Sequence, residues 1–276
     1  MDGTGIANRL AINGIGYNAS AGKWRSEAMR SHASPRLIYF AKGQGRITVA
    51  GLTRGYGPNN LIFVPANTMY GFEIGPTVFG TLLTIPAAMQ SEWPESPQHL
   101  RLRDVIAQKE FAQLFDALER ELLSERPGHG RAAHHHLGLL SVMFERHCQL
   151  HSEIIQSDQE QRRTASARLV AAYSDLVERD FRTKRNVADY AAALGVTPTH
   201  LTRCCNKTCS KSALALLNDR ILFEARMQLR GTKNPIQDIA HNLGFTSPAY
   251  FSRSFQSATG MTPSAFRRRG PINFSF

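Results

Sequence analysis

Cationic side chains are the most abundant charged groups in this sequence, and their excess over acidic side chains lies in its C-terminal part. Residues 160–276 hold 18 Lys and Arg against 8 Asp and Glu, whereas residues 1–159 hold 15 against 14. The formal net charge of the whole chain is +11. Such an asymmetry indicates a polyanionic partner for the C-terminal part, although a solvated basic surface would give the same count.

Thiol and imidazole groups are present, but their spacing favours neither catalysis nor metal binding. The four cysteines are Cys148, Cys204, Cys205 and Cys209, and they form no disulfide framework and no zinc module. The run 134–136 holds three histidines without further spaced ligands, which indicates a solvated tract. We therefore expect no catalytic residue, no cofactor and no metal. The cysteine content fits a reducing, cytoplasmic compartment.

An internal repeat in the basic part is the most informative pattern. Residues 187–197, VADYAAALGVT, match residues 236–246, IQDIAHNLGFT, at an offset of 49 residues. After a one-residue insertion in the second copy the match continues, so that Arg203 corresponds to Arg253. The chain therefore contains two related units of the same local design.

The first helix of each unit has recognisable start and stop signals. Asn186 and Asn234 are expected to cap these helices, with Pro235 in the first helical position of the second unit. Gly195 and Gly244 are expected to end them, since a residue at that point often needs a positive φ.

The second helix of each unit begins with a hydroxyl cap followed by proline, at Thr197–Pro198 and at Ser247–Pro248. Helix, glycine turn and capped helix make a helix-turn-helix, which places its second helix in the DNA major groove. One such pattern is common in helical proteins that bind no DNA. Two copies in a basic setting strongly favour DNA binding.

The segment between the units is expected to be a connecting helix. Leu214, Leu217, Ile221 and Leu229 in residues 211–229 follow a helical period. At 1.5 Å per residue this segment would span about 28 Å. The two recognition helices would then lie about one turn of DNA apart, roughly 34 Å.

The N-terminal half has a different pattern. Apolar runs at 37–40, 47–49, 61–64 and 78–85 are separated by Gly, Pro and Asn, which predicts a small barrel or sandwich of strands. Residues 1–30 read as an irregular leader without a signal peptide, and no membrane span is expected. Two helices are expected at about 102–118 and 132–151, either covering the barrel or pairing with a second subunit.

Residues of about 175–269 resemble the AraC/XylS family of bacterial transcription activators. Residues 236–267, including Gly260, Thr262 and Pro263, follow the family signature almost throughout, and residues 217–229 look like its linker helix. The first unit departs from the pattern. Where the family usually has a large apolar residue and then Thr-Gly, this chain has Cys205 and then Cys209–Ser210.

The resemblance implies that groove contacts come from the exposed face near the start of each recognition helix. These residues are Thr199, His200, Thr202 and Arg203 in the first unit and Pro248, Ala249, Ser252 and Arg253 in the second. Arg203 is suited to guanine O6 and N7. Arg253 is as compatible with a phosphate as with a base. The family also implies contact with RNA polymerase.

The strand-rich segment resembles the cupin-type sensor domain of many such regulators. Metal-binding cupins usually have a histidine after the Pro-containing turn, where this chain has Tyr70, so we expect neither a metal nor cupin enzyme chemistry. A small barrel can hold one ligand. Arg36, Arg54 and Tyr70 are candidate effector contacts, because Arg suits a carboxylate. Residues of these types are more often ordinary surface or turn residues than ligand contacts, and that reading is the favoured one for each of the three.

The expected fold class is α+β: a cupin-like β-barrel, a helical dimerisation segment and an all-α domain with two helix-turn-helix units joined by a linker helix. The expected boundaries are a sensor domain at 1–100, a dimerisation segment at 101–156, a linker at 157–174 and a DNA-binding domain at 175–276.

The expected function is sequence-specific transcription regulation by an activator that forms a homodimer and binds a small effector. Regulation by abundance or by a protein partner, without a ligand, is the alternative. An enzyme on the barrel would need a His/Glu cluster in residues 31–90, which we do not find. A non-specific architectural DNA protein also remains open.

Overall fold

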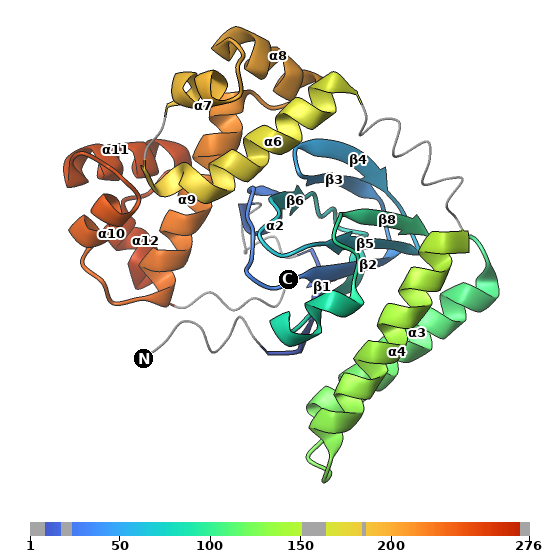
Figure 1. Cartoon of the computed structure of the whole chain (residues 1–276). Helices are drawn as coiled ribbons and strands as arrows, with labels where there is room; N and C mark the ends of the chain where they lie inside the picture. The colour runs from blue at the N-terminus through green and yellow to red at the C-terminus, as the bar shows by residue number, and fades with distance from the viewer. Residues whose placement is uncertain (1–8, 18–23, 151–163, 184–185, 271–276) are drawn as a thin grey trace.

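The N-terminal half is built on two antiparallel sheets in the computed structural model, which describes residues 9–17, 24–150, 164–183 and 186–270. The larger sheet has the strand order β1(Ala11–Gly16), β7(Phe79–Thr84), β2(Arg36–Lys42), β5(Asn60–Val64) and β8(Gln98–Arg101). The smaller has the order β4(Leu52–Tyr56), β3(Gly45–Val49) and β6(Tyr70–Phe72). Together with the C-terminal helices they confirm the α+β class (Figure 1).

The strand register explains which side chains fill the space between the sheets. Ile38 lies opposite Ile62 and Leu82 in the larger sheet, and Ile47 lies opposite Phe72 in the smaller one. Paired residues point to the same face, and these five are buried in one apolar cluster. The alternate residues of the larger sheet point outward, as the period of a strand requires.

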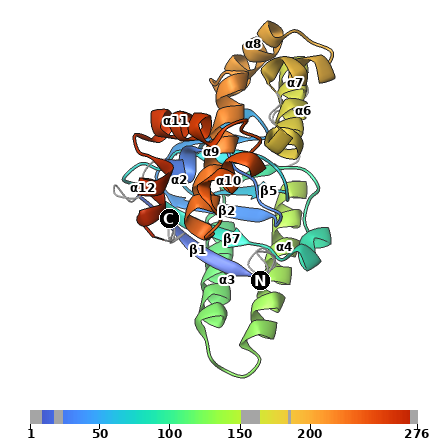
Figure 2. The same cartoon turned by 90° about the vertical axis from the view of Figure 1, so that its left-hand side faces the viewer.

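Two long helices cover that outward face. α3(Val105–Leu123) and α4(His129–Leu150) are antiparallel, and Asp104 caps α3 by accepting a hydrogen bond from the Ala107 amide at 3.0 Å. Phe111 and Phe144 pack in one cluster with Phe63 of β5. Both views show the hairpin extending away from the C-terminal helices (Figures 1 and 2). Its turn lies between the two helices expected from the sequence.

Several N-terminal elements were not predicted, and β1, α2 and β4 are among them. β1 lies in the expected leader and pairs with β7 along its whole length, from Ala11 opposite Thr84 to Gly16 opposite Phe79. The short helix α2(Trp24–Glu27) also lies in that leader, and β4 lies where only a turn was expected. Polar and glycine residues interrupt β1 and β4, so their apolar alternation is weak and long-range pairing defines them.

The C-terminal half contains only helices among its described residues. The first unit comprises α6(Ala165–Asp180), the short η2(Phe181–Thr183), α7(Val187–Ala193) and α8(Pro198–Cys209). The connecting helix is α9(Ala213–Gly231), and the second unit comprises α10(Ile236–Asn242), α11(Pro248–Thr259) and α12(Pro263–Arg268). One apolar cluster runs through both units. The two units lie toward opposite ends of α9 (Figures 1 and 2).

The two halves of the chain are packed against each other. Met29 and Met69 of the N-terminal half belong to the apolar cluster of the helical half, together with Val170 of α6. The guanidinium of Arg30 is fully buried and lies between the rings of Tyr70 and Phe223, at 5.2 and 5.6 Å from their centroids. Cation–π contacts of this kind strengthen when they are desolvated. The sensor-like half therefore touches α6 and α9 directly.

The packing of α6 bears on the domain boundaries. The expected linker at 157–174 overlaps α6, which begins at Ala165, while residues 157–163 lie outside the described part of the chain. The boundaries remain proposals, and we assign α6 to the helical domain. Within the described ranges, no helix has both the length and the apolar character needed to cross a membrane.

Candidate nucleic-acid interface

Both recognition helices are capped as the sequence predicts. The hydroxyl of Thr197 accepts a hydrogen bond from the His200 amide at 3.2 Å, and the hydroxyl of Ser247 accepts one from the Tyr250 amide at 3.2 Å. Gly195 and Gly244 have φ values of +68° and +73°, which closes each turn in the left-handed region. These signals fix where α8 and α11 begin.

The first helices of the two units start differently from each other. Asn186 forms a full capping box with Asp189, with hydrogen bonds of 2.9 and 3.2 Å in the two directions. Asn234 does not cap α10. The position before that helix is Pro235, and the Asn234 carbonyl instead accepts a hydrogen bond from Arg267 at 2.6 Å. The expected cap at Asn234, with Pro235 as the first helical residue, was therefore wrong: α10 begins one residue later, so Pro235 occupies the capping position and has no side-chain polar group to accept a hydrogen bond.

The predicted groove contacts of the first unit lie near the start of α8 with little protein around them. Thr199, His200 and Arg203 are exposed and Thr202 is half-buried. The opposite face of α8 is buried through Leu201 and Cys205. An amphipathic helix of this kind presents hydroxyl, imidazole and guanidinium groups that can donate to base edges and phosphates.

The second unit repeats this arrangement on α11. Ala249 and Arg253 are exposed, and Pro248 and Ser252 are half-buried. Sequence reasoning missed Tyr250, whose side chain is 51% exposed on the same helix despite its large apolar ring. Its position directly after Pro248–Ala249 was the available signal. A phenol at this point can donate to a phosphate or pack on a thymine methyl.

The core of the first unit shows how small residues are accommodated under α8. Cys204, Cys205 and Cys209 are buried, and the α6 residues Val170 and Tyr173 belong to the same apolar cluster. Burial raises the pKa of Cys205 to about 12, with Cys209 and Cys204 adding to the shift, so the thiol stays protonated. It therefore acts as a small apolar core group rather than as a nucleophile.

The second unit uses aromatic rings for the same purpose. Phe251 lies 5.8 Å from Phe255, and Phe255 lies 5.4 Å from Phe266 of α12, measured between ring centroids. Edge-to-face and tilted pairs of this kind add to the apolar burial. The two units thus hold equivalent recognition helices with different cores.

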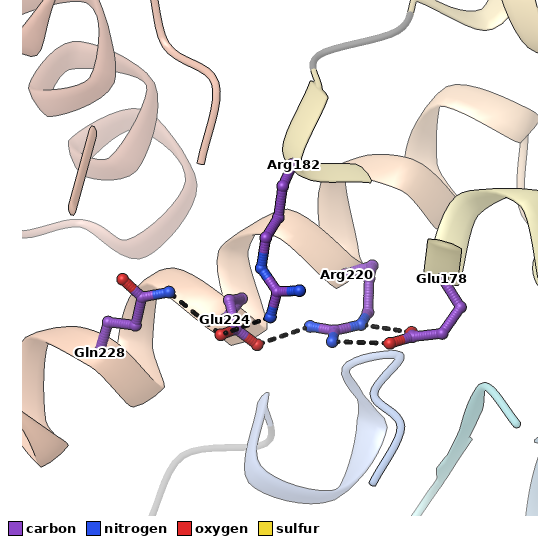
Figure 3. A network of polar contacts seen from close by, with 5 residues as sticks. All are labelled: Glu178, Arg182, Arg220, Glu224 and Gln228. Carbon is purple, nitrogen blue, oxygen red and sulfur yellow. Dashed lines mark hydrogen bonds and ion pairs between the residues drawn. The ribbon is translucent and has the colours of Figure 1, made fainter. Parts of the chain in front are cut away.

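A buried ionic network fixes α9 relative to α6 (Figure 3). Arg220 on α9 donates to both carboxylate oxygens of Glu178 on α6 at 2.6 and 3.0 Å, and to Glu224 at 3.1 Å. Arg182 reaches Glu224 at 3.3 Å and Gln228 donates to it at 3.1 Å. Burial raises the pKa of Glu224, but Arg220, Gln228 and Arg182 outweigh it, so the pKa lies below its ordinary value.

The basic end of the chain has a divided role. Arg267 donates to the carbonyls of Leu229 and Asn234 at 3.2 and 2.6 Å, which ties α12 to the end of α9. Arg268 and Arg269 are exposed. The exposed pair is therefore more accessible to a phosphate than the half-buried Arg267.

The three candidate effector contacts do not form one cluster. Arg36 makes a side-chain hydrogen bond with Tyr70 and donates to the hydroxyl of Thr84. Arg54 on β4 instead borders a separate cavity with His99. Among the described residues, no group of three or more His, Cys, Asp or Glu side chains could hold a metal ion.

Comparisons with known proteins match both halves of the chain. A profile described as an AraC-like ligand binding domain matches residues 15–140, and a helix-turn-helix domain profile matches residues 190–269. The regulatory protein SoxS of Salmonella typhimurium is 33% identical over 84 residues, which are 30% of this chain and 78% of SoxS.

The arabinose operon regulatory protein of Salmonella typhimurium is 26% identical over 165 residues, which are 59% of this chain and 55% of that protein. The chain thus spans about half the length of this relative, and 28% of its Escherichia coli counterpart. A crystal structure of ToxT from Vibrio cholerae is 12% identical, with a TM-score of 0.45, over 94% of this chain and 96% of ToxT.

Proposed function

Because the chain belongs to the AraC/XylS family of transcription regulators, we propose that it reads specific DNA duplexes through α8 and α11 and regulates transcription in response to a small effector. The observation that carries the proposal is the pairing of two capped recognition helices. Each starts with exposed polar side chains while its opposite face is buried. Relatives of this kind are transcription regulators, which argues against an enzyme.

The spacing of the two helices supports reading by a single subunit. Both units pack on α9, whose 19 residues correspond to a rod of about 28 Å. Recognition helices near the ends of such a rod are suited to major-groove segments about one DNA turn, roughly 34 Å, apart. Sequence-selective reading distinguishes this proposal from a non-specific architectural protein.

The remaining parts of the function follow from the family and from the N-terminal half. The effector would bind the sensor domain, with Arg36, Arg54 and Tyr70 as candidate contacts. Activation would involve contact with RNA polymerase, and the protein would act in the cytoplasm. The α3–α4 hairpin is our candidate for homodimerisation. Ile106, Leu123 and Leu150 on it are 66%, 79% and 77% exposed, which is apolar area that a second copy would cover.

In vitro selection from a randomised duplex pool tests the proposal without knowledge of the operator. We expect the full chain to enrich a motif with two major-groove segments. Arg203→Ala should weaken binding to the enriched duplex by about 1–3 kcal/mol and relax the choice of one base pair. Arg101→Ala, an exposed arginine on the sensor strand β8, is the matched control.

Failure to enrich any motif, with equal affinity for scrambled duplexes, would contradict sequence-specific reading. Unchanged affinity and unchanged base choice in Arg203→Ala would contradict the placement of α8 in the groove. If the protein enriches a motif but no small molecule alters its DNA binding, effector control is contradicted. Control by abundance or by a protein partner is then the favoured explanation.

A further inference from the structure

A cavity of about 210 Å³ lies at one end of the space between the two sheets, and α6 covers it. The sheet side of its lining includes Ile47 and Leu52, and the helix side includes Ala167, Arg168 and Ala171. Because β3 pairs with β4 so that Ile47 lies opposite Arg54, the Arg54 side chain points to the same inner face. The cavity is therefore bordered jointly by the sensor half and by the first helix of the DNA-binding half.

The charges around this cavity have one sign. Its ionisable lining residues are Arg54, His99 and Arg168, and the described lining holds no Asp or Glu. His99 is fixed by a contact of 2.6 Å between its Nε2 and Oδ1 of Asn60. Arg54 is half-buried, whereas Arg168 is exposed and stands at the rim. Two arginines that line one largely apolar space favour an anion, and a carboxylate matches the planar donor geometry of a guanidinium.

The size and the walls of the cavity restrict the rest of the ligand. Ile47, Val49, Leu52 and Ile62 provide apolar walls. A dry cavity of about 150 Å³ with walls of this kind holds a benzene molecule. A space of about 210 Å³ therefore accommodates one ring, or an apolar body of equal size, together with a carboxylate.

We infer that this cavity binds a monocarboxylate with a single-ring apolar body, whose carboxylate pairs with Arg54 of the barrel and Arg168 of α6. The inference rests on the proposed function, since it names the class of effector and the residues that read it. Such a ligand contacts both halves of the chain, so it binds the arrangement in which α6 is docked more tightly than any other. A ligand shifts a conformational equilibrium only through such differential affinity.

Calorimetric titration of the full chain with benzoate, phenylacetate and cinnamate tests the inference, with the neutral amide of each acid as its control. We expect at least one acid to bind with 1:1 stoichiometry and its amide to bind at least tenfold more weakly. Arg54→Met and Arg168→Met should each weaken that acid by about tenfold or more, equivalent to about 1.4 kcal/mol. Arg103→Met, an exposed arginine outside the lining, should leave binding unchanged.

Filling the cavity provides a second, charge-independent variant. Ala171→Leu should abolish binding of the acid while the circular dichroism spectrum stays that of the wild type, and Ala171→Phe extends the series. The inference is overturned if none of the three acids binds, if acid and amide bind equally, or if the Arg54, Arg168 and Ala171 variants all retain wild-type affinity.

Measuring both acid binding and motif enrichment on the same protein preparation distinguishes a failure of this inference from a failure of the proposed function. Enrichment of a DNA motif without binding of any acid would reject the cavity assignment and leave DNA reading intact. Binding of an acid without any enriched motif would reject sequence-specific regulation and leave the ligand site intact.

Discussion

At the scale of single residues, Arg220 is a buried cation that links α6 to α9. It is 4% exposed, and its partners Glu178 and Glu224 are 15% and 18% exposed. A buried ion pair gains little over an apolar pair, but removing one partner leaves a buried charge without compensation. The two acids also belong to different helices, so the loss would loosen α6 from α9.

Arg220→Met is expected to lower the free energy of unfolding of the helical half by about 3 kcal/mol. The exposed Arg182→Met, which removes a surface contact to the same Glu224, should cost no more than about 1 kcal/mol. Both tryptophans lie in the N-terminal half, so the measurement is urea denaturation followed by circular dichroism at 222 nm. Equal losses in the two variants would contradict the central role of Arg220.

The same network gives a pH dependence with a definite sign. The pKa of Glu224 is below its ordinary value of 4.5 in the folded chain, so its contribution is fully present above pH 4.5. That contribution is lost as the pH falls from 4.5 through the folded pKa, where the acid takes up a proton. Arg220→Met should flatten this acid branch of the stability profile, and an unchanged slope would argue against the network as its cause.

At the scale of elements, local signals determined the C-terminal helices well. Thr197, Ser247 and the two turn glycines act as predicted, because caps and turns depend on neighbours within a few residues. β1 could not be predicted, since its partner β7 lies far along the chain and its own pattern is weak. The groove residues could be placed on exposed faces, whereas the cavity under α6 depends on tertiary packing that no local pattern encodes.

The C-terminal ends of α8 and α11 show what the departure from the family pattern costs. Ser210 adopts a φ of +54° at the position where the second unit has Gly260 at +75°. A residue with a Cβ is strained in this region, by about 1–2 kcal/mol. The first unit therefore carries a backbone cost that the second avoids.

Ser210→Gly is expected to raise the free energy of unfolding by about 0.5–1 kcal/mol, because the lost strain exceeds the added chain entropy of glycine. The reverse change, Gly260→Ser, should lower it by about the same amount through the same mechanism. No heavy atom lies within 4 Å of a Cβ built at Gly260, so steric overlap does not complicate the comparison. Chemical denaturation of both variants checks the opposite signs, and shifts of the same sign would contradict it.

At the scale of the whole molecule, the contact between the halves includes one very close approach of backbone to helix. The β3–β4 turn brings Gly51 so near to α6 that a Cβ there would overlap Cγ1 of Val170 and lie 3.0 Å from Oγ of Ser174. Its φ of +72° also belongs to the left-handed region. Docking of the sensor half on α6 therefore requires this position to lack a side chain.

Gly51→Asn isolates the steric part of that requirement, since Asn tolerates a positive φ better than other side chains. We expect faster hydrogen exchange in α6 around Val170 and weaker coupling of effector to DNA, with affinity for DNA retained. Gly128→Asn is the matched control, because its φ is +83° and no atom lies within 4 Å of its Cβ position. Wild-type exchange of α6 in Gly51→Asn would show that docking tolerates a side chain at the turn.

The placement of α8 has a mechanical consequence. Its first residues face solvent, while Cys209 and Ser210 at its far end border a small cavity shared with Thr48 and Thr53 of the sheet. A helix of 12 residues is about 18 Å long, so a small rotation of α8 about its C-terminal end, which lies beside the sensor sheet, moves its N-terminal residues much further. A tilt of about 5° displaces the N-terminal end by about 1.5 Å, enough to break a hydrogen bond to a base. A motion too small to alter the fold would thus decide whether these first residues contact their DNA sequence.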